Sequence, residues 1–408
     1  MKRLAGLAVV LAACGPGART HDAALPERCE DRGLPPTTIS GIVLAPNHTL
    51  PLYGATVYIP ASEPGPFTDG VACSRCTDPP PGDALARATS DELGRFTLAN
   101  APAGRDVPIV IQLGKWRRRA TLPEVVPCRA NEAPVELTAL PRSRAEGDLP
   151  RIAIATGGCD ALECLLRKLG VADEEFTPDY EDGRVHLYAS TGADHLEGRP
   201  LAAARTLWAD PDRLRRYDIA MFSCECRPFG DDKTPEMVAN VRAFADAGGR
   251  VFLSHYHNVW LGRAWPGVAS CPSDEVTFAN GVIDAQGHPK SAAFAGWMAA
   301  IGAAPNNSFP IEEGRQTCTG LDPARAERWI RLDGTPFPQT FQFTTPNDAA
   351  PEARCGRVVF SDVHVATGSR SAPETPFPLG CASVALAPQE QALAFLFFDI
   401  ASCVGPVL

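Results

Sequence analysis

After its first fourteen residues, the chain has no hydrophobic run long enough to cross a bilayer as a helix. Basic residues are also in deficit: 38 Lys and Arg stand against 48 Asp and Glu, for a net charge of −10. Such a balance disfavours binding to polyanions, so we expect no nucleic-acid partner. A complete phosphate-binding or dinucleotide-binding glycine motif is missing too. Gly157-Gly158 therefore predicts only a tight turn, and we expect no nucleotide cofactor.

The first residues carry an export pattern. Met1-Lys2-Arg3 precedes a short apolar run, which ends in Leu11-Ala12-Ala13-Cys14. A positive start, an apolar stretch and small residues before a cut are the signs of a signal peptide. Residues 1–14 resemble the signal peptide and lipobox of a bacterial lipoprotein. The resemblance implies lipid on Cys14, a membrane partner through that lipid and, with Gly15 next, the outer membrane. Residues 15–36, rich in Gly, Pro and charge, are expected to be a tether.

Fourteen cysteines fit an oxidising compartment, in which thiols pair as disulfides. Lipidation of Cys14 leaves thirteen, so we expect at least one cysteine to be free or paired between chains. Cys29 is positioned to pin the end of the tether to the first domain. Cys73-x-x-Cys76 lies in a Pro/Gly-rich loop, where structural disulfides are favoured over a zinc site that would need two more ligands.

Residues 37–140 predict an all-β domain. Short apolar segments bounded by turn residues are expected to form strands at 39–44, 55–59, 95–98, 107–113 and 135–140. This pattern is typical of a β-sandwich. The motifs G-x-V from Gly41, P-L-x-x-A-x-V from Pro51 and D-x-x-G-x-F from Asp91 resemble those of carboxypeptidase regulatory-like, transthyretin-like domains. That resemblance implies a non-catalytic module for presentation or binding.

After an expected linker at 141–150, residues 151–408 predict an α/β domain. Strands are expected at 151–156, 218–223, 250–254 and 356–365, and helices from 162, over 235–247, around 294–301 and over 388–400. This alternation is typical of a doubly wound, mostly parallel sheet with helices on both faces. Asp160 and Glu163 have the spacing of a helix-capping pair, which we favour over an acid/base role.

The strand ends gather most of the reactive side chains of this domain. Open parallel sheets bind ligands beyond the carboxyl ends of their strands. The residues at those ends that we consider as catalytic candidates are Cys224, Glu225, His255, His257 and His364. The candidate ligands of a divalent metal are His255, His257, Asp362 and His364, because in extended backbone a spacing of two puts side chains on one face. The alternative is that these histidines only hydrogen-bond to loop backbone.

The order of elements resembles the class I glutamine amidotransferase-like fold of the trehalose-utilisation type. The motifs that carry the resemblance are the Tyr217-Asp218 strand, the Gly248-Gly249 turn, the following His255, and the strand from Gly356 to His364. With the β domain and the Gly114-Lys115-Trp116 segment, the chain resembles predicted bacterial lipoproteins of uncharacterised activity. The resemblance implies a nucleophilic cysteine on the sharp turn after the strand at 250–254, but that turn is Ser254-His255-Tyr256-His257 and has no cysteine. We therefore expect no glutamine hydrolysis.

Cys224 follows a different strand. With Glu225 and a nearby histidine it could form another nucleophile site, but Cys224 and Cys226 are more in keeping with disulfides or with one odd thiol. The first hypothesis for function is therefore a cell-envelope lipoprotein that binds an envelope glycan or a protein without catalysis. The alternative is a metal- or histidine-dependent hydrolase that acts on sugars or peptides at the strand ends.

Overall fold

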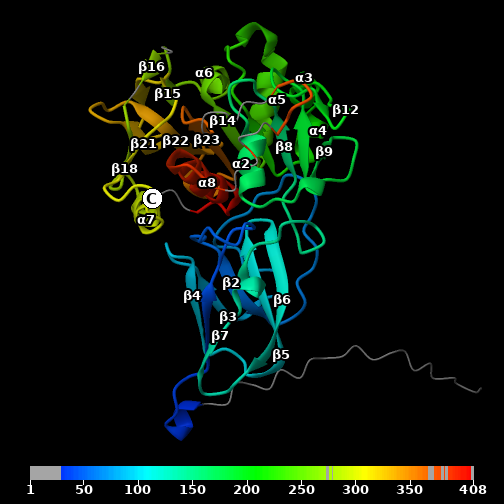
Figure 1. Cartoon of the computed structure of the whole chain (residues 1–408), viewed down its shortest axis with the longest axis vertical. Coiled ribbons are helices and arrows are strands. Elements are labelled where there is room, and N and C mark those ends of the chain that lie inside the picture. The colour runs from blue at the N-terminus through cyan, green and yellow to red at the C-terminus, as the bar shows by residue number, and fades with distance from the viewer. Residues whose placement is uncertain are drawn as a thin grey trace, which may run out of the picture.

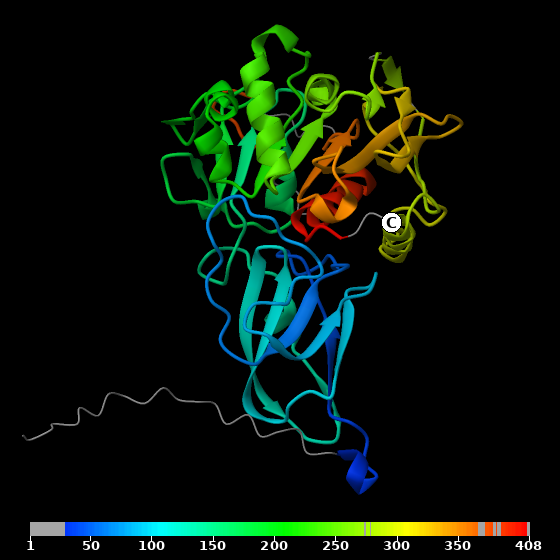
Figure 2. The same cartoon turned by 180° about the vertical axis from the view of Figure 1, so that it is seen from behind.

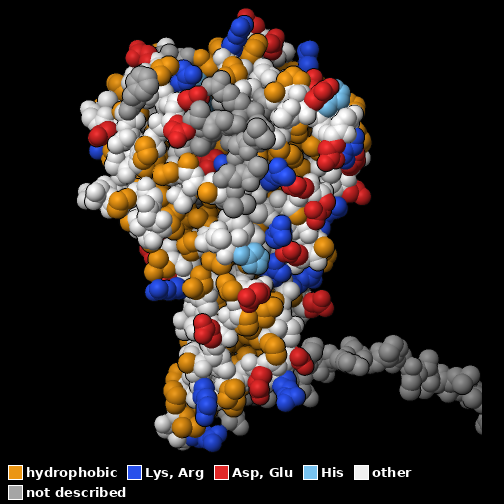
Figure 3. All heavy atoms as spheres, in the orientation of Figure 1, with side chains coloured by type: hydrophobic (Ala, Val, Ile, Leu, Met, Phe, Trp, Pro, Cys, Tyr) orange, Lys and Arg blue, Asp and Glu red, His pale blue; other side chains and the backbone are white. Residues whose placement is uncertain are grey.

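The computed structural model describes residues 29–272, 275–277, 279–365, 372–377, 381 and 385–405. Cys14 and the expected signal peptide lie outside this part of the chain. Figure 1 shows a smaller β domain below a larger α/β domain, and Figure 2 shows the same arrangement from behind. On the face shown in Figure 3, acidic and basic side chains are interspersed.

The N-terminal domain contains two small β-sheets. Its elements are η1 (Cys29–Arg32), β1 (Thr38–Ile42), β2 (Thr56–Pro60), β3 (Ala84–Thr89), β4 (Arg95–Ala99), β5 (Gly104–Leu113), β6 (Trp116–Val125), β7 (Ala130–Glu132) and α1 (Val135–Thr138). One sheet has the order β4-β1-β7, and the other has the order β3-β2-β5-β6. Inward-facing residues such as Ile39, Phe96 and Ile109 form a buried apolar core. Alternation of buried and exposed positions in β4 matches the half-buried strand predicted there.

One predicted strand of this domain is wrong. Residues 135–140 begin with the short helix α1, whose Thr138 hydroxyl donates to the carbonyl of Ile42 at 2.6 Å. The helix turns Ala139 and Leu140 into the core, while Val135 stays exposed. A six-residue apolar segment does not specify a strand by itself, because a single helical turn can bury the last residues of the segment equally well.

The second domain is built on a ten-stranded sheet of order β18-β17-β21-β22-β23-β14-β13-β8-β10-β9. These strands are β8 (Ile152–Ala155), β9 (Phe176–Pro178), β10 (Val185–Tyr188), β13 (Ile219–Phe222), β14 (Arg250–Ser254), β17 (Gly281–Ile283), β18 (Ser308–Phe309), β21 (Glu327–Leu332), β22 (Pro338–Thr345) and β23 (Gly356–Ser361). The strands from β23 to β9 are parallel to one another, and those from β18 to β22 are antiparallel. The sheet is therefore mixed, and its parallel part is the one that the sequence predicts.

Helices cover both faces of this sheet. The helices are α2 (Leu162–Lys168), α3 (Ala204–Ala209), α4 (Pro211–Arg215), α5 (Pro235–Asp246), α6 (Asn258–Ala264), α7 (Pro289–Ala300) and α8 (Pro388–Ala401), with 3-10 turns η2 (Asp173–Glu175), η3 (Gly230–Asp232), η4 (His255–His257) and η5 (Pro351–Ala353). Alternate residues of β8, β13 and β14 belong to two separate buried clusters. One cluster packs against α2, α7 and α8, and the other against α3 to α6.

Three two-stranded ribbons project from the α/β domain. They pair β11 (His195–Leu196) with β12 (Arg199–Pro200), β15 (Ala269–Ser270) with β20 (Gly320–Leu321), and β16 (Glu275–Thr277) with β19 (Gly314–Gln316). The Cys271–Cys318 disulfide joins the two segments that form the last two ribbons.

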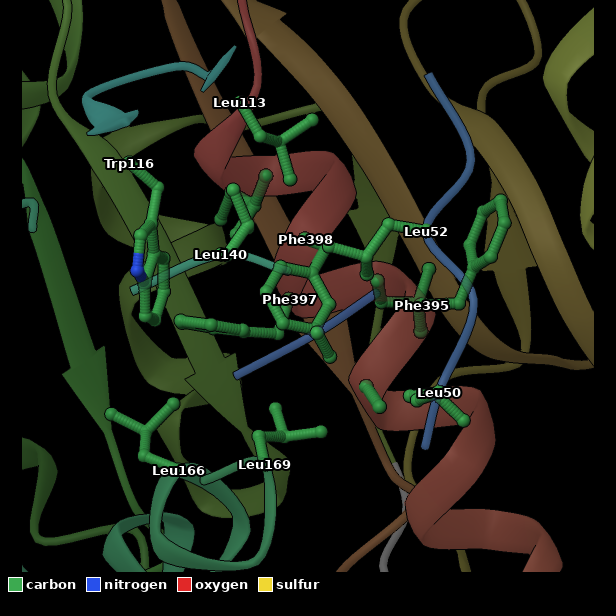
Figure 4. Close-up of a cluster of buried hydrophobic side chains, with 14 of the residues drawn as sticks. Leu50, Leu52, Leu113, Trp116, Leu140, Leu166, Leu169, Phe395, Phe397 and Phe398 are labelled. Atoms are coloured by element: carbon green, nitrogen blue, oxygen red, sulfur yellow. The ribbon is translucent and has the colours of Figure 1, made fainter. Parts of the chain in front are cut away.

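The two domains share one apolar core. Figure 4 shows Phe397 and Phe398 of α8 beside Trp116 and Leu113 of the β domain. The Trp116 indole also donates to the carbonyl of Pro141 at 2.8 Å, within the expected linker. Arg117, fully buried, pairs with Asp148 at 2.8 Å, so the linker is packed at the domain boundary.

Six disulfides connect twelve of the described cysteines, as the composition predicts. Cys29 pairs with Cys128, and Cys73 and Cys76 pair with Cys355 and Cys403. The last two bonds join the domains. The other three pairs are Cys159–Cys226, Cys164–Cys381 and Cys271–Cys318, all in the α/β domain. The presence of six disulfides indicates an oxidising, extracytoplasmic compartment. No helix in the described residues has the length and apolar character that a membrane span requires.

Candidate functional site

The carboxyl ends of three adjacent strands, β13, β14 and β23, bring the predicted residues to one edge of the sheet. In the sheet, β14 lies between β13 and β23, with Phe222 opposite Leu253 and Ser254 opposite Ser361. The residues that follow these strands must therefore meet. Cys224 comes after β13, His255 directly after β14, and His364 three residues after the end of β23.

Cys224, His255 and His364 form a compact buried group. Their potential ligand atoms all lie within 4.8 Å of one another. The Cys224 Sγ is 3.2 Å from the His255 Nδ1, and the two imidazole rings are 5.2 Å apart between centroids. The three side chains are at most 3% exposed. Cys224 is the one free cysteine of the described chain, so it is the odd thiol that the cysteine count predicts.

His255 stands on a sharp turn between β14 and η4. Its φ of 43° lies in the left-handed region, which is uncommon for a residue other than glycine. Residues held in that region cluster at functional sites, because the surrounding structure must hold them there. The turn aims the imidazole back toward the β13 loop.

Burial keeps the Cys224 thiol protonated in the absence of a cation. Removal from water, with a smaller contribution from the nearby Asp160 carboxylate, raises its pKa from 9.0 to about 12. Backbone hydrogen bonds from Cys226 and Tyr256, and the charge of Arg315, act in the opposite direction. The sulfur thus has hydrogen-bond donors for a thiolate, but lacks the charge neutralisation that a thiolate needs in a buried site.

Asp160 belongs to the same site, although the sequence suggested a capping role. The N-cap of α2 is Ala161, and no side chain caps that helix end. The Asp160 carboxylate instead accepts a hydrogen bond from the Ser254 hydroxyl at 2.6 Å and one from the Val365 amide at 2.9 Å. Burial raises the pKa of Asp160 to about 7 against the effect of these bonds. The capping prediction is wrong because the turn that begins at Gly157 places the Asp160 carboxylate against Ser254 and Val365, at the ends of β14 and of the segment after β23.

Gly157 makes this close approach possible. A Cβ atom at this position would lie 2.3 Å from the carbonyl oxygen of Cys224. The turn after β8 therefore packs directly against the loop after β13, where the Cys159–Cys226 disulfide also joins them. The predicted tight turn is present, and its glycine is required by contact with the candidate site.

His257 does not share the site of His255. The expected extended backbone is a 3-10 turn, in which residues two apart point in different directions. One ring nitrogen of His257, Nε2, lies 3.0 Å from the Ser223 carbonyl oxygen, and the other, Nδ1, accepts from the Trp260 indole at 2.9 Å. Burial lowers its pKa to about 4, so the ring is neutral. With both nitrogens occupied, His257 is a structural residue in this fold.

Asp362 and Glu225 also have partners of their own. The Asp362 Oδ2 accepts from the backbone amide of Thr317 at 3.0 Å, which ties β23 to the ribbon region. Glu225 binds the buried Lys233 ammonium at 2.5 Å and accepts from the Ser190 hydroxyl at 2.5 Å. Burial opposes the charge of Glu225, but the Lys233 ammonium and the hydrogen bonds from Lys233 and Ser190 hold its pKa below the usual value. Glu225 thus binds the loop after β13 to Lys233 and Ser190 and does not pair with the Cys224 thiol.

Sequence reasoning missed four residues of this edge: Ser190, Lys233, Ser254 and Arg315. Ser190 follows β10, a strand that the sequence analysis did not assign. Ser254 and Arg315 carry no motif, and their closeness to Asp160 and Cys224 arises only from the sheet and the ribbons. The signal for Ser254 was available in the assigned strand 250–254, whose last residue lies at the ligand-binding edge.

Comparisons with known proteins give no family. No family model and no curated protein matches the chain. Solved structures match weakly. A chain of a cohesin–X-dockerin complex from Acetivibrio cellulolyticus is 15% identical over 36% of this chain and 78% of that chain, with a TM-score of 0.17. A chain of PurLQS from Thermotoga maritima is 9% identical over 61% of this chain and 99% of that chain, with a TM-score of 0.31. The exo-β-1,4-mannosidase Op5Man5 from Opitutaceae bacterium strain TAV5 is 10% identical over 66% and 38%, with a TM-score of 0.28. Likenesses this low carry no argument about function.

Proposed function

We propose that this protein is an exported metal-binding protein in which Cys224, His255 and His364 hold one transition-metal ion. The observation that carries the proposal is the closeness of one thiol and two imidazoles, whose ligand atoms lie within 4.8 Å of one another. A tetrahedral zinc ion with ordinary bond lengths separates sulfur and nitrogen ligands by about 3.6 Å. The 3.2 Å between Cys224 Sγ and His255 Nδ1 is close to this value.

The chemistry of the three donors favours a thiophilic ion. Thiolate and imidazole ligands suit zinc and copper, whereas magnesium and calcium prefer oxygen. Among the described cysteines, Cys224 alone stays reduced, although twelve others are paired as disulfides. A bound cation supplies the positive charge that the buried thiolate lacks, because a coordinating thiol loses its proton. We therefore propose Zn²⁺ as the ion to test first.

The ligand set leaves room for a second candidate function. Three protein ligands and one open position are the arrangement of catalytic zinc sites, in which the fourth ligand is water. This favours the metal-dependent hydrolase among our two hypotheses over the glycan- or protein-binding role, which stays a prediction. A free-standing Cys–His nucleophile is supported by the 3.2 Å contact, but the buried, protonated sulfur opposes it.

We extend the proposal to the setting of the protein. The two N-terminal sheets support a carboxypeptidase regulatory-like sandwich, and the parallel strands β8, β13, β14 and β23 support an amidotransferase-like layer. The disulfides support export. The lipid anchor on Cys14 in the outer membrane is part of the same proposal, and globomycin-sensitive processing with radiolabelled palmitate incorporation would test it. A Cys14→Ser variant that still takes up palmitate would contradict it.

The metal proposal is tested on the purified full chain. Stoichiometry by plasma mass spectrometry after Zn²⁺ loading and desalting should give one ion per chain. Cys224→Ser and His364→Ala should each lose the ion, because each removes one of three ligands. His195→Ala is the matched control, since His195 is half-exposed beside Asp194 and outside the group. Equal metal content in wild type and Cys224→Ser would overturn the proposal.

The hydrolase candidate needs its own readout. The turnover of chromogenic glycoside and peptide substrates is measured with three forms of the protein: the metal-loaded chain, the chelated chain and the Cys224→Ser variant. Turnover that depends on the metal and on Cys224 would support hydrolysis. Stoichiometric metal without turnover on either substrate class would leave a metal-binding protein and reject the sugar or peptide hydrolase.

A further inference from the structure

The two imidazoles of the metal group come from separate segments of the α/β domain. His255 follows β14, and His364 lies in the loop after β23. A metal site of defined geometry needs both rings held in place before the ion arrives. The turn after β8, which carries Asp160, contacts both of these segments.

Asp160 contacts the chain neighbours of both histidines. Its Oδ2 accepts from the hydroxyl of Ser254, the residue directly before His255, at 2.6 Å. Its Oδ1 accepts from the backbone amide of Val365, the residue directly after His364, at 2.9 Å. One carboxylate, 1% exposed, thus joins the two segments that carry the ligands. We propose that Asp160 is the positioning residue of the metal centre, acting through Ser254 and Val365.

Other contacts show that the His364 segment is held from two sides. The Gln389 amide, at the start of α8, donates to the carbonyl of His364 at 2.9 Å, and Gln389 accepts from the Glu312 amide at 2.6 Å. Asp160, in the turn after β8, accepts from the Val365 N–H of the same peptide group, so both polar atoms of that group are held. The His255 side has Ser254 as its link to Asp160, so substitution of Ser254 separates positioning from ligation.

The Asp160 side chain is not the N-cap of helix α2. Its carboxylate makes no cap to that helix, whose N-cap is Ala161. A carboxylate without water around it is costly unless hydrogen bonds satisfy it, and both of its oxygens are used in the bridge between the ligand segments. The hydrogen bonds from Ser254 and Val365 therefore tie this buried carboxyl group to both ligand segments.

This inference rests on the proposed metal function, and its test uses Co²⁺ as the probe. Co²⁺ bound to a thiolate gives a sulfur-to-metal charge-transfer band that reports the geometry of the centre. Ser254→Ala removes one arm of the bridge while the carboxylate and all three ligands remain. We expect its Co²⁺ affinity to fall about tenfold or more, within the range known for partners of metal ligands, and its band to shift. Asp160→Ala, which removes both arms, should lose more, and Asp160→Asn should recover part of the loss.

Ser291→Ala is the matched control. Ser291 is also fully buried, and its hydroxyl closes the first turn of α7 by accepting from the His288 amide. Loss of that bond should lower thermal stability and leave the Co²⁺ spectrum unchanged. Co²⁺ affinity and spectrum equal to wild type in both Ser254→Ala and Asp160→Ala would overturn the positioning role. Failure of the wild type itself to bind Co²⁺ and Zn²⁺ would instead overturn the metal proposal, so the two failures are distinguishable.

Discussion

The reactivity of the Cys224 thiol discriminates between a metal ligand and a nucleophile. Moving its pKa from 9.0 to about 12 lowers the thiolate fraction at neutral pH about a thousandfold. A more basic thiolate is a better nucleophile, and a Brønsted slope of about 0.4–0.5 returns a factor of about 15–30. The pKa alone should therefore slow alkylation about 30- to 60-fold relative to an ordinary thiol. The lack of exposed surface on Cys224 slows it further.

The assay is alkylation by iodoacetamide without reductant, followed by mass spectrometry of the peptide that contains Cys224. The chelated native chain should label at least 30-fold more slowly than the same chain in denaturant, where the thiol is exposed and its pKa is ordinary. Localisation to the peptide separates Cys224 from Cys14. Native labelling as fast as in denaturant would refute the buried, protonated thiol and favour the Cys224–His255 nucleophile.

Three further predictions concern stability. Burial lowers the pKa of both His186 and His257 to about 4. Each ring therefore binds a proton more weakly in the folded protein than in the unfolded chain, and the free energy of unfolding should fall as the pH drops from about 6.5 to 4. The loss is on the order of 3 kcal/mol for each, and His257→Gln should flatten the slope in urea titrations at several pH values. Phe397→Ala empties part of the core between the domains and should cost about 3–5 kcal/mol, measured by urea unfolding; a cost below about 1 kcal/mol would contradict that packing. Replacing Cys73 and Cys355 together by Ser should lower stability by about 2–4 kcal/mol in the same assay, and an unchanged midpoint would count against the inter-domain bond.

Elements with strong local signals were predicted well. The helix α5 was predicted over 235–247, and in the structure it spans Pro235–Asp246, with the Thr234 hydroxyl accepting from the Met237 amide. The strand β14 has the predicted bounds. Both are specified by residues next to one another, namely a cap, a proline, a glycine pair and a continuous apolar run.

Elements with mixed signals were missed or misassigned. The strands β3 and β6 were not predicted, because arginines and exposed residues interrupt the alternation in both. Arginine is usually a surface residue, yet Arg117 at the start of β6 is fully buried. Its guanidinium has Asp148 and the Gly65 carbonyl as partners, both distant in sequence. A buried ion pair of this kind depends on a partner that local sequence does not reveal.

By itself, the sequence determined which reactive side chains the protein has and near which strand ends they lie. The cysteine count leaves one thiol, histidines follow two of the predicted strands, and the apolar periodicity predicts the parallel layer. Only the tertiary structure decided which of these groups meet. The 3-10 turn at η4 sends His255 and His257 to different surroundings, and the pairing of Cys226 with Cys159 leaves Cys224 reduced. The physical reason is that metal ligation and carboxylate bridging require atoms within a few ångströms. Sheet order and backbone turns set such distances among residues about thirty to two hundred positions apart, beyond the reach of local propensity.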